Sequence, residues 1–248
     1  MARPRTVALI PCRLESSRLP RKALVDIGGL PMVVHVYKRC LLAKNIDDVF
    51  VATDSEEIRE HVVKHGGQVI MTGSHHETGT DRIAEACQTL DCEIVVNVQG
   101  DEALVDPLHV DAVVAALQVD PLVKVGILVN SFTKYNSPSD IKTVLDMHGN
   151  VLYFSRSDIP SSARTPNPPL LKAYHIVPFR KEFLLEYAAW PKGYLERIEF
   201  NEYLRILEQG EKIRAVQVES SAVSVDTPAD LDFVRQAMKS DRYFPQYR

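Results

Sequence analysis

The chain has little net charge, few cysteines and no long apolar segment. A formal net charge of −4 at pH 7 argues against a nucleic-acid-binding protein that neutralises many phosphates. The four cysteines show no zinc-type spacing and are expected to be reduced thiols. No apolar run approaches the ~20 residues that span a bilayer, and the N-terminal run is too short for a secretory signal. We therefore expect a soluble, cytoplasmic protein that binds neither nucleic acid nor membrane.

Glycine is also scarce, at 11 of 248 residues, and forms no spaced fingerprint of a nucleotide-binding loop. The pattern GxGxxG is missing, which counts against an NAD-dependent enzyme, and GxxxxGK[ST] is missing, which excludes a Walker P-loop. No spacing typical of metal ligands links His61, His65, His75, His76 and His109, so we expect these histidines at the surface.

Short apolar runs alternate with helical patterns in the first part of the chain, and this alternation predicts a parallel sheet. Strands are expected at residues 6–11, 49–53, 68–71 and 94–98. Near-continuous apolar strands separated by helices are typical of a parallel sheet covered on both faces. Such sheets bind ligands at the carboxyl ends of their strands, so the loops that follow these strands are the candidate site. In the second half, residues 194–209 show the pattern of one helix that Gly210 ends.

A basic segment follows the first expected strand and contains Arg13, Arg18, Arg21 and Lys22 within ten residues. Guanidinium and ammonium groups at this density suit a triphosphate, because three or four negative charges must be neutralised in one place. The alternative is a solvated basic surface loop. The position at the carboxyl end of a strand favours the phosphate site.

Two aspartates are candidate magnesium ligands. Asp101 follows the fourth expected strand, where a carboxylate can hold Mg²⁺ against substrate phosphates. Asp226 comes just before a late helix, for which Thr227 is the expected cap, with Pro228 at the first helical position. For each aspartate taken alone, a capping or loop role is the alternative.

Arg82 and Glu202 are candidates for binding an acidic substrate. Arg82 lies in the first turn of an expected helix, where it is placed to bind a carboxylate, and ordinary helix capping is the alternative for this segment. Glu202 falls on the inward apolar stripe of the helix expected at 194–209. An inward carboxylate is costly unless it is paired or used, so both a functional role and a structural ion pair stay open.

Eight segments together resemble the CMP-Kdo synthetases, which are 3-deoxy-manno-octulosonate (Kdo) cytidylyltransferases. They follow the family order and spacing, and they read IPCRLESSRLPRKAL, GGLPMVVHVYKR, VFVATDSEEI, GGQVIMT, HETGTDRIAEA, VNVQGDE, VLYFSR and VDTPADL. The resemblance implies an α/β, nucleotidyltransferase-type (Rossmann-like) fold with a mainly parallel sheet and a smaller inserted α+β dimerisation subdomain. For this chain it implies a nucleotide-binding core in 1–130, an acceptor-binding and dimerisation subdomain in 131–212, and a return to the core in 213–248.

The resemblance also implies an enzyme of lipopolysaccharide biosynthesis that transfers CMP from CTP to the anomeric hydroxyl of a small acidic sugar. It implies Mg²⁺ as cofactor and a homodimer. By this resemblance Arg13, Lys22 and Asp101 act in catalysis, and Mg²⁺ is held by Asp101 and Asp226. The nucleotide is expected at Arg13, Ser17, Arg18, Lys22, Met71, Thr72, Gly73 and Ser74, and the segment from Met71 to His76 is expected to line the pocket for the cytosine base. The acceptor is expected at Arg82, Gln99, Glu202 and Tyr203.

The chain departs from the family at positions associated with the acceptor. Where the family reads KHxGxYxYR, this chain reads KAYHIVPFR, which places Ala173, His175 and Val177 at the family's histidine, glycine and first tyrosine. Tyr203 replaces a family glutamine, and Arg21 replaces a glycine of the phosphate loop. Lost hydrogen-bonding groups change selectivity strongly. Kdo is the first expectation, and the alternatives are CMP activation of another small acid and a non-catalytic nucleotide-binding regulator. Retention of both aspartates counts against the regulator.

Overall fold

The computed structural model describes residues 3–16, 19–220 and 223–248. The chain divides into two compact units, Met1–Asp111 with Ala222–Arg248 (unit 1) and Ala112–Ser221 (unit 2). Helix α4 (Pro107–Val119) begins in the first and continues into the second. No helix of the described residues is long and apolar enough to cross a membrane.

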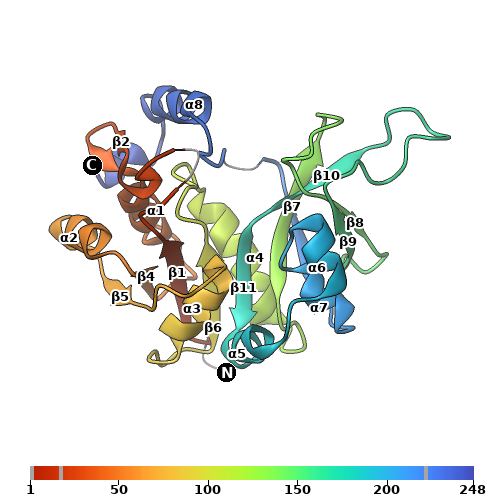
Figure 1. Cartoon of the computed structure of the whole chain (residues 1–248), viewed down its shortest axis with the longest axis horizontal. Coiled ribbons are helices and arrows are strands. Elements are labelled where there is room, and N and C mark those ends of the chain that lie inside the picture. Colours follow the sequence, from red (N-terminus) through yellow and green to blue (C-terminus); the bar gives the residue numbers. More distant parts are fainter. Residues whose placement is uncertain (1–2, 17–18, 221–222) are drawn as a thin grey trace. The chain divides into compact units, whose positions relative to one another are not determined.

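Unit 1 contains the predicted parallel sheet, with β6 (Ile94–Val98), β1 (Thr6–Cys12), β4 (Asp48–Thr53) and β5 (Val69–Met71) in this order. All three pairings are parallel. Every residue of β6 is buried, as its almost wholly apolar sequence predicts for a strand covered on both faces. The four strands expected from the sequence are therefore confirmed (Figure 1).

The helices of unit 1 pack on this sheet. Helices α1 (Met32–Cys40) and α3 (Gly79–Cys87) contact β1, and α2 (Glu56–Lys64) contacts β4 and β5. The side chain of Thr78 caps α3 through a capping box with Asp81, which satisfies backbone donors at the start of the helix. A short 3₁₀ helix, η1 (Lys22–Leu24), and a two-stranded ribbon, β2 (Asp26–Ile27) and β3 (Leu30–Pro31), connect β1 to α1.

The C-terminal segment returns to unit 1 and ends in α8 (Pro228–Met238) and the 3₁₀ helix η2 (Phe244–Gln246). Thr227 caps α8 with Pro228 in the first turn, so the predicted helix start is confirmed. An apolar cluster joins this segment to the N-terminal part of the unit, and its buried members are Ile27, Met32, Ala103, Val225, Leu231, Val234 and Met238. This buried contact holds the return segment against the N-terminal part of unit 1.

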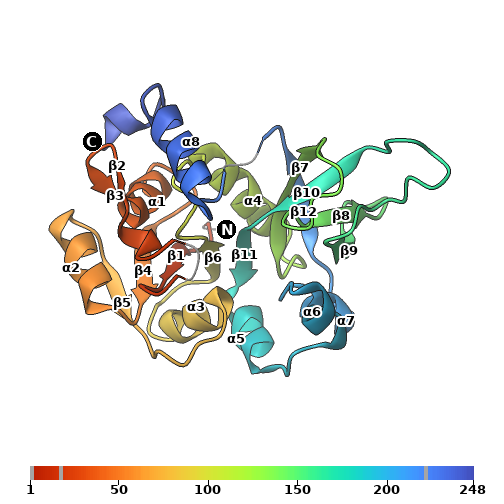
Figure 2. The same ribbon diagram turned by 45° about the horizontal axis from the view of Figure 1, so that its top comes forward.

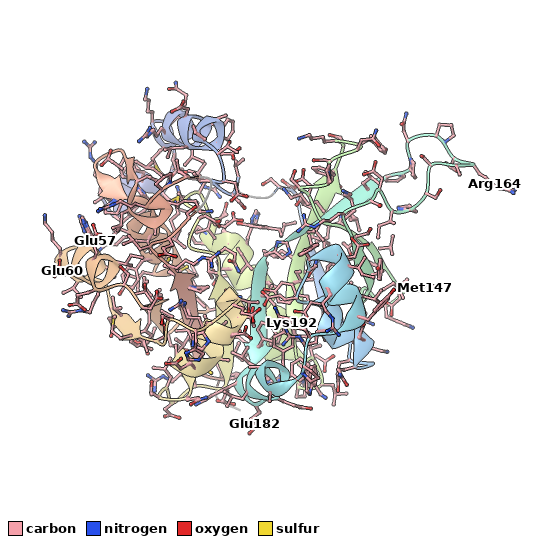
Figure 3. The ribbon with its side chains drawn as sticks, viewed as in Figure 1. Glu57, Glu60, Met147, Arg164, Glu182 and Lys192 are labelled. Atoms are coloured by element: carbon pink, nitrogen blue, oxygen red, sulfur yellow. The ribbon has the colours of Figure 1, made fainter. Side chains whose placement is uncertain are left out.

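Unit 2 is built on a mixed sheet in the order β12, β7, β10, β8, β9 (Figure 2). Its strands are β7 (Gly126–Phe132), β8 (Lys142–Leu145), β9 (Val151–Ser155), β10 (Leu170–Tyr174) and β12 (Arg214–Val218). Only the β12–β7 pairing in this sheet is parallel. Strand β11 (Ile176–Arg180) leads into α5 (Lys181–Ala189). A long loop between β9 and β10 carries Arg164 near its tip (Figure 3).

The prediction of a single helix at 194–209 is wrong. The structure has two short helices there, α6 (Tyr194–Glu199) and α7 (Leu204–Glu208). Phe200 ends the first with a left-handed φ of 50°, a conformation in which an α-helix does not continue. Glu202 therefore lies in the turn between the helices and not on a helical stripe.

Candidate active site

A cavity of about 400 Å³ opens in unit 1 at the carboxyl ends of β1 and β6. Its lining comes from the basic loop after β1, the start of α3, the loop after β6 and the return segment before α8. This is the edge of the sheet at which the sequence places the site. Of the predicted site residues, those that line the cavity are Arg13, Lys22, Arg82, Gln99, Asp101 and Asp226.

Lys22 lies between the two predicted metal ligands. Its Nζ is 2.7 Å from Oδ2 of Asp101 and 3.0 Å from Oδ1 of Asp226. Burial lowers the pKa of Lys22, but the two carboxylates raise it by more, so its pKa lies above the ordinary value. Lys22 is therefore a protonated cation held by both aspartates, which are far apart in the chain.

Backbone and side-chain bonds bring Asp226 to Asp101. The N–H of Val225 donates to the carbonyl oxygen of Asp101 at 3.1 Å. The hydroxyl of Ser224 donates to Oε1 of the buried Glu102 at 2.6 Å. These contacts join the return segment to the loop after β6. The positions of the Asp101 and Asp226 carboxylates therefore depend on each other's segments. Glu102 and Ser224 were not predicted as site residues, and no motif in the sequence marks their pairing.

The two aspartates fit a divalent cation as well as they fit the ammonium group of Lys22. Carboxylate oxygens are the ligands that Mg²⁺ prefers, usually one or two from the protein with substrate phosphates and waters completing the shell. The pair already converges on one positive charge. The donor set is therefore suited to a magnesium ion that arrives with a polyphosphate.

Arg82 is buried, at 4% exposure, and is tied to the segment after β5. Its Nη1 donates to Oγ1 of Thr72 at 2.6 Å and to the carbonyl oxygen of Gly73 at 3.3 Å, and it lies 3.4 Å from a carboxylate oxygen of Asp54. Arg82 thus links the cavity to the segment predicted to bind the nucleobase. Nearby, the side-chain amide of Gln99 donates to Oδ1 of Asn97 at 3.3 Å, which orients it at the cavity wall.

Gly100 makes room for the end of β1. A Cβ at this position would lie 2.3 Å from Sγ of Cys12 and 3.0 Å from the carbonyl oxygen of Pro11. Cys12 lines the cavity, but burial raises the pKa of its thiol to about 12, so it is not a nucleophile at neutral pH. The close approach of the two loops requires glycine at position 100.

In unit 2 the positions that differ from the family pattern are packed in the interior. Ala173 and Val177 are each 1% exposed and Tyr203 is 2% exposed. The ring of His175 stacks on Tyr203 at a centroid distance of 5.8 Å. Burial, with Lys172 and Arg156 nearby, lowers the pKa of His175 to about 4, so its imidazole is neutral at pH 7. The hydroxyl of Tyr187 donates to the carbonyl oxygen of Glu202 at 3.1 Å, which fixes the turn that carries Glu202.

Comparisons with known proteins agree with this geometry. Residues 7–213 match the cytidylyltransferase family. A 3-deoxy-manno-octulosonate cytidylyltransferase of Geobacter sulfurreducens is 41% identical over 246 residues, which covers 94% of this chain and 98% of the relative. The chain belongs to the 3-deoxy-manno-octulosonate cytidylyltransferase family.

Members and structures of this family extend the comparison. An 8-amino-3,8-dideoxy-manno-octulosonate cytidylyltransferase of Shewanella halifaxensis is 39% identical and covers 90% of this chain and 94% of its own length. The structure of CMP:2-keto-3-deoxy-manno-octonic acid synthetase complexed with CTP is 37% identical, with a TM-score of 0.92 over 95% of this chain and 98% of that one. The predicted family and the α/β nucleotidyltransferase fold are confirmed, and the chain is a cytidylyltransferase.

The structure does not bring the other residues predicted for the nucleotide or the phosphates into the lining of the cavity, apart from two that it does not describe. Ser17 and Arg18 lie outside the described residues. The segment from Met71 to Ser74 lies beside the cavity and reaches it through Arg82. Arg21, which stands where the family has glycine, has a left-handed φ of 56° and pairs with Glu57 of α2 instead of lining the cavity. Glu57 is labelled in Figure 3.

Proposed function

We propose that this cytidylyltransferase transfers CMP from CTP to the anomeric hydroxyl of Kdo, with Mg²⁺ as cofactor and pyrophosphate as the second product. The observation that carries this proposal is the ion pair of Lys22 with Asp101 and Asp226 inside the cavity. It supplies a phosphate-binding cation and a carboxylate pair for a metal in one place. The 41% identity to a Kdo cytidylyltransferase supports the choice of acceptor.

The reaction forms a bond between the anomeric oxygen and the α-phosphorus of CTP and breaks the bond from that phosphorus to the oxygen of pyrophosphate. The hydroxyl releases its proton to solvent, and pyrophosphate leaves with the electron pair of the broken bond and the negative charge. Mg²⁺ bound at Asp101 and Asp226 would neutralise phosphate charge and orient the polyphosphate. Arg13 and Lys22 line the cavity and add positive charge where the leaving group develops negative charge. Gly79, the first residue of α3, also lines the cavity, and the positive end of the helix dipole favours an anionic ligand there.

In this proposal Arg82 and Gln99, which line the cavity of unit 1, bind the acceptor. The family resemblance also assigns Glu202 and Tyr203 to the acceptor. Arg82 keeps a fixed cation at the cavity wall, which suits the carboxylate of a sugar acid. We also propose that the enzyme forms a homodimer through unit 2. It acts in the cytoplasm, where CTP is made. Light scattering of the purified protein tests the dimer.

A second candidate acceptor is the 8-amino analogue of Kdo. The relative from Shewanella halifaxensis is named for it and is nearly as similar to this chain as the Kdo enzymes are. Apolar or aromatic groups at Ala173, Val177 and Tyr203 also differ from the polar groups that the family resemblance associates with Kdo. The chemistry at the α-phosphorus is the same for both acceptors.

Pyrophosphate release by the purified protein with CTP and Mg²⁺ tests the proposal, with Kdo, its 8-amino analogue or no acid. Release that depends on Kdo and stops on chelation of Mg²⁺ supports it. Release with the analogue alone assigns the second candidate. Release without either acid, or none with either acid from a protein that binds CTP, overturns both. The variant Asp101→Asn tests whether the reaction takes place in this cavity. We expect it to lower turnover by at least ~100-fold.

A further inference from the structure

Three possible metal ligands meet at the loop between β5 and α3, and one of them, His76, lines the cavity. None of them has a step in the proposed reaction. His75 and His76 lie in the loop between β5 and α3, and Glu85 lies on α3. Each offers one ligand atom, and these atoms all lie within 4.8 Å of one another. The sequence alone predicts no metal site at these histidines, because Glu85 follows them at a distance that matches no common motif. The turn into α3 brings the three together.

The carboxylate of Glu85 is held in a fixed orientation. Its two oxygens accept from the backbone N–H of Gly73 at 3.1 and 3.2 Å, and one of them contacts Nε2 of His76. Carboxylates that bind metals are typically oriented by such additional hydrogen bonds. The ligand is therefore in place before any ion binds.

The loop also makes room for the imidazole of His75. A Cβ on Gly73 would lie 2.5 Å from Nδ1 and Cε1 of His75 and 3.4 Å from an oxygen of Glu85. The two imidazole rings lie with their centroids 4.3 Å apart. Gly73 thus serves both ligands, since its N–H binds Glu85 and its missing side chain leaves space for His75.

We infer that His75, His76 and Glu85 form a binding site for a zinc-class transition-metal ion, separate from the carboxylate pair Asp101 and Asp226. Two imidazole nitrogens and one carboxylate are a ligand set typical of Zn²⁺ with one position left for water. Mg²⁺ prefers oxygen ligands, so the two sites select different metals. His75 is exposed and His76 partly exposed, which gives an ion access.

The chain contains few competing soft ligands. All four cysteines are buried and free of disulfides. The main competing pair is His61 and His65, which are four residues apart at the end of α2. His65 already uses Nδ1 in a 2.7 Å hydrogen bond with the carbonyl oxygen of His61. Among the described residues this pair belongs to no cluster of three possible metal ligands, so it provides the matched control.

An ion at this site would join the loop after β5 to α3. The same loop contains Thr72 and Gly73, which Arg82 binds. Metal binding would therefore stiffen the segment assigned to the nucleobase, a consequence that rests on the proposed function. The existence of the site does not, because it is inferred from the three ligands and their contacts alone.

Zinc titration of the whole protein against a chromophoric chelator, in excess Mg²⁺ to occupy the carboxylate pair, tests this inference. We expect one tightly bound equivalent, weakened at least ~10-fold by His75→Ala and by Glu85→Gln and unchanged by His61→Ala. Glu85→Gln retains an oxygen for the N–H of Gly73, and circular dichroism checks that each variant is folded. Bound Co²⁺ should show a visible spectrum of a nitrogen–oxygen site. No tight equivalent, equal binding by His75→Ala and the unchanged chain, or loss in His61→Ala would overturn the inference.

Discussion

Lys22 and Asp101 are 79 residues apart in the chain, yet the ammonium group of one lies 2.7 Å from the carboxylate of the other. Asp226, which lies near the other end of the sequence, has a carboxylate oxygen 3.0 Å from the same ammonium group. The cation that the family resemblance assigns to the phosphates thus occupies the position between the two expected metal ligands. A divalent ion must compete with Lys22 unless a polyphosphate draws the lysine away.

This competition predicts tighter metal binding when Lys22 is replaced. Lys22→Gln keeps most of the side-chain length and removes its charge, so the aspartates bind Mn²⁺ more strongly in the absence of nucleotide. We expect an increase of about tenfold, or ~1.4 kcal/mol, measured from the free Mn²⁺ signal in electron paramagnetic resonance. Turnover should fall by at least ~100-fold, because a charge that stabilises the phosphates is lost.

The matched control is Lys239→Gln, which removes an exposed lysine of unit 1 whose partner is Gln236 of the same helix. It should change neither Mn²⁺ binding nor turnover. Unchanged or weaker Mn²⁺ binding by Lys22→Gln would contradict the competition between lysine and metal.

Gly100→Ala should destabilise the contact between the loops after β1 and β6. The added methyl group would lie 2.3 Å from Sγ of Cys12 and 3.0 Å from the backbone oxygen of Pro11, and we expect a cost of about 1–3 kcal/mol in the free energy of unfolding. Combining it with Cys12→Ala should recover part of this loss, because the sulfur is removed while the backbone contact stays. Chemical denaturation of the single and double variants measures the coupling. Additive effects would show that the two residues do not clash.

Ser224→Ala tests how the return segment holds Asp226. The hydroxyl donates at 2.6 Å to the buried Glu102, next to Asp101. Its loss should cost about 1 kcal/mol of stability and raise the Mg²⁺ concentration needed for half-maximal activity. Ser240→Ala, whose exposed hydroxyl makes only a 3.5 Å contact within its own turn, should change neither quantity. An unchanged Mg²⁺ requirement for Ser224→Ala would show that this bond does not position Asp226.

His175 should make the protein less stable in mild acid. Its pKa is about 4 in the folded chain because of burial and the nearby charges of Lys172 and Arg156, and about 6.5 in the unfolded chain. Between these values the unfolded chain binds a proton that the folded chain does not, so stability falls as pH decreases from 6.5 towards 4. The full shift corresponds to about 3 kcal/mol, and partial exposure of the ring reduces the expected loss to roughly half.

The measurement compares the free energy of unfolding at pH 7 and pH 5 for the unchanged chain and for His175→Phe, which retains an aromatic ring beside Tyr203. The variant should lose less stability between the two pH values. His148→Gln, an exposed histidine in the turn between β8 and β9, is the control and should behave as the unchanged chain does. Equal pH dependence of His175→Phe and the unchanged chain would show that His175 is not the group responsible.

The strands of unit 1 could be predicted because each is a short, mostly apolar run that the local sequence specifies. The run at 94–98 is an example, since all five residues are buried in β6. The start of α8 was equally local, because Thr227, Pro228 and Asp230 form its cap within four positions. Features that depend on neighbouring residues alone were therefore confirmed.

Features that depend on distant segments could not be predicted in detail. The sequence marked Lys22, Asp101 and Asp226 separately, but nothing in it shows that one lysine bridges both carboxylates. The break between α6 and α7 was missed because Phe200 adopts a left-handed conformation that its residue type does not announce. The cluster of His75, His76 and Glu85 was missed because these residues meet only when α3 folds back beside the loop.

The most direct test of the account is a phosphorus-31 NMR time course of the purified protein with CTP, Mg²⁺ and Kdo. If the chain transfers CMP to Kdo, a phosphodiester resonance and pyrophosphate appear in equal amounts as CTP disappears, and only when the acid is present. Unchanged CTP, or pyrophosphate without a phosphodiester product, would contradict the assignment of this chain as an enzyme that transfers CMP to Kdo.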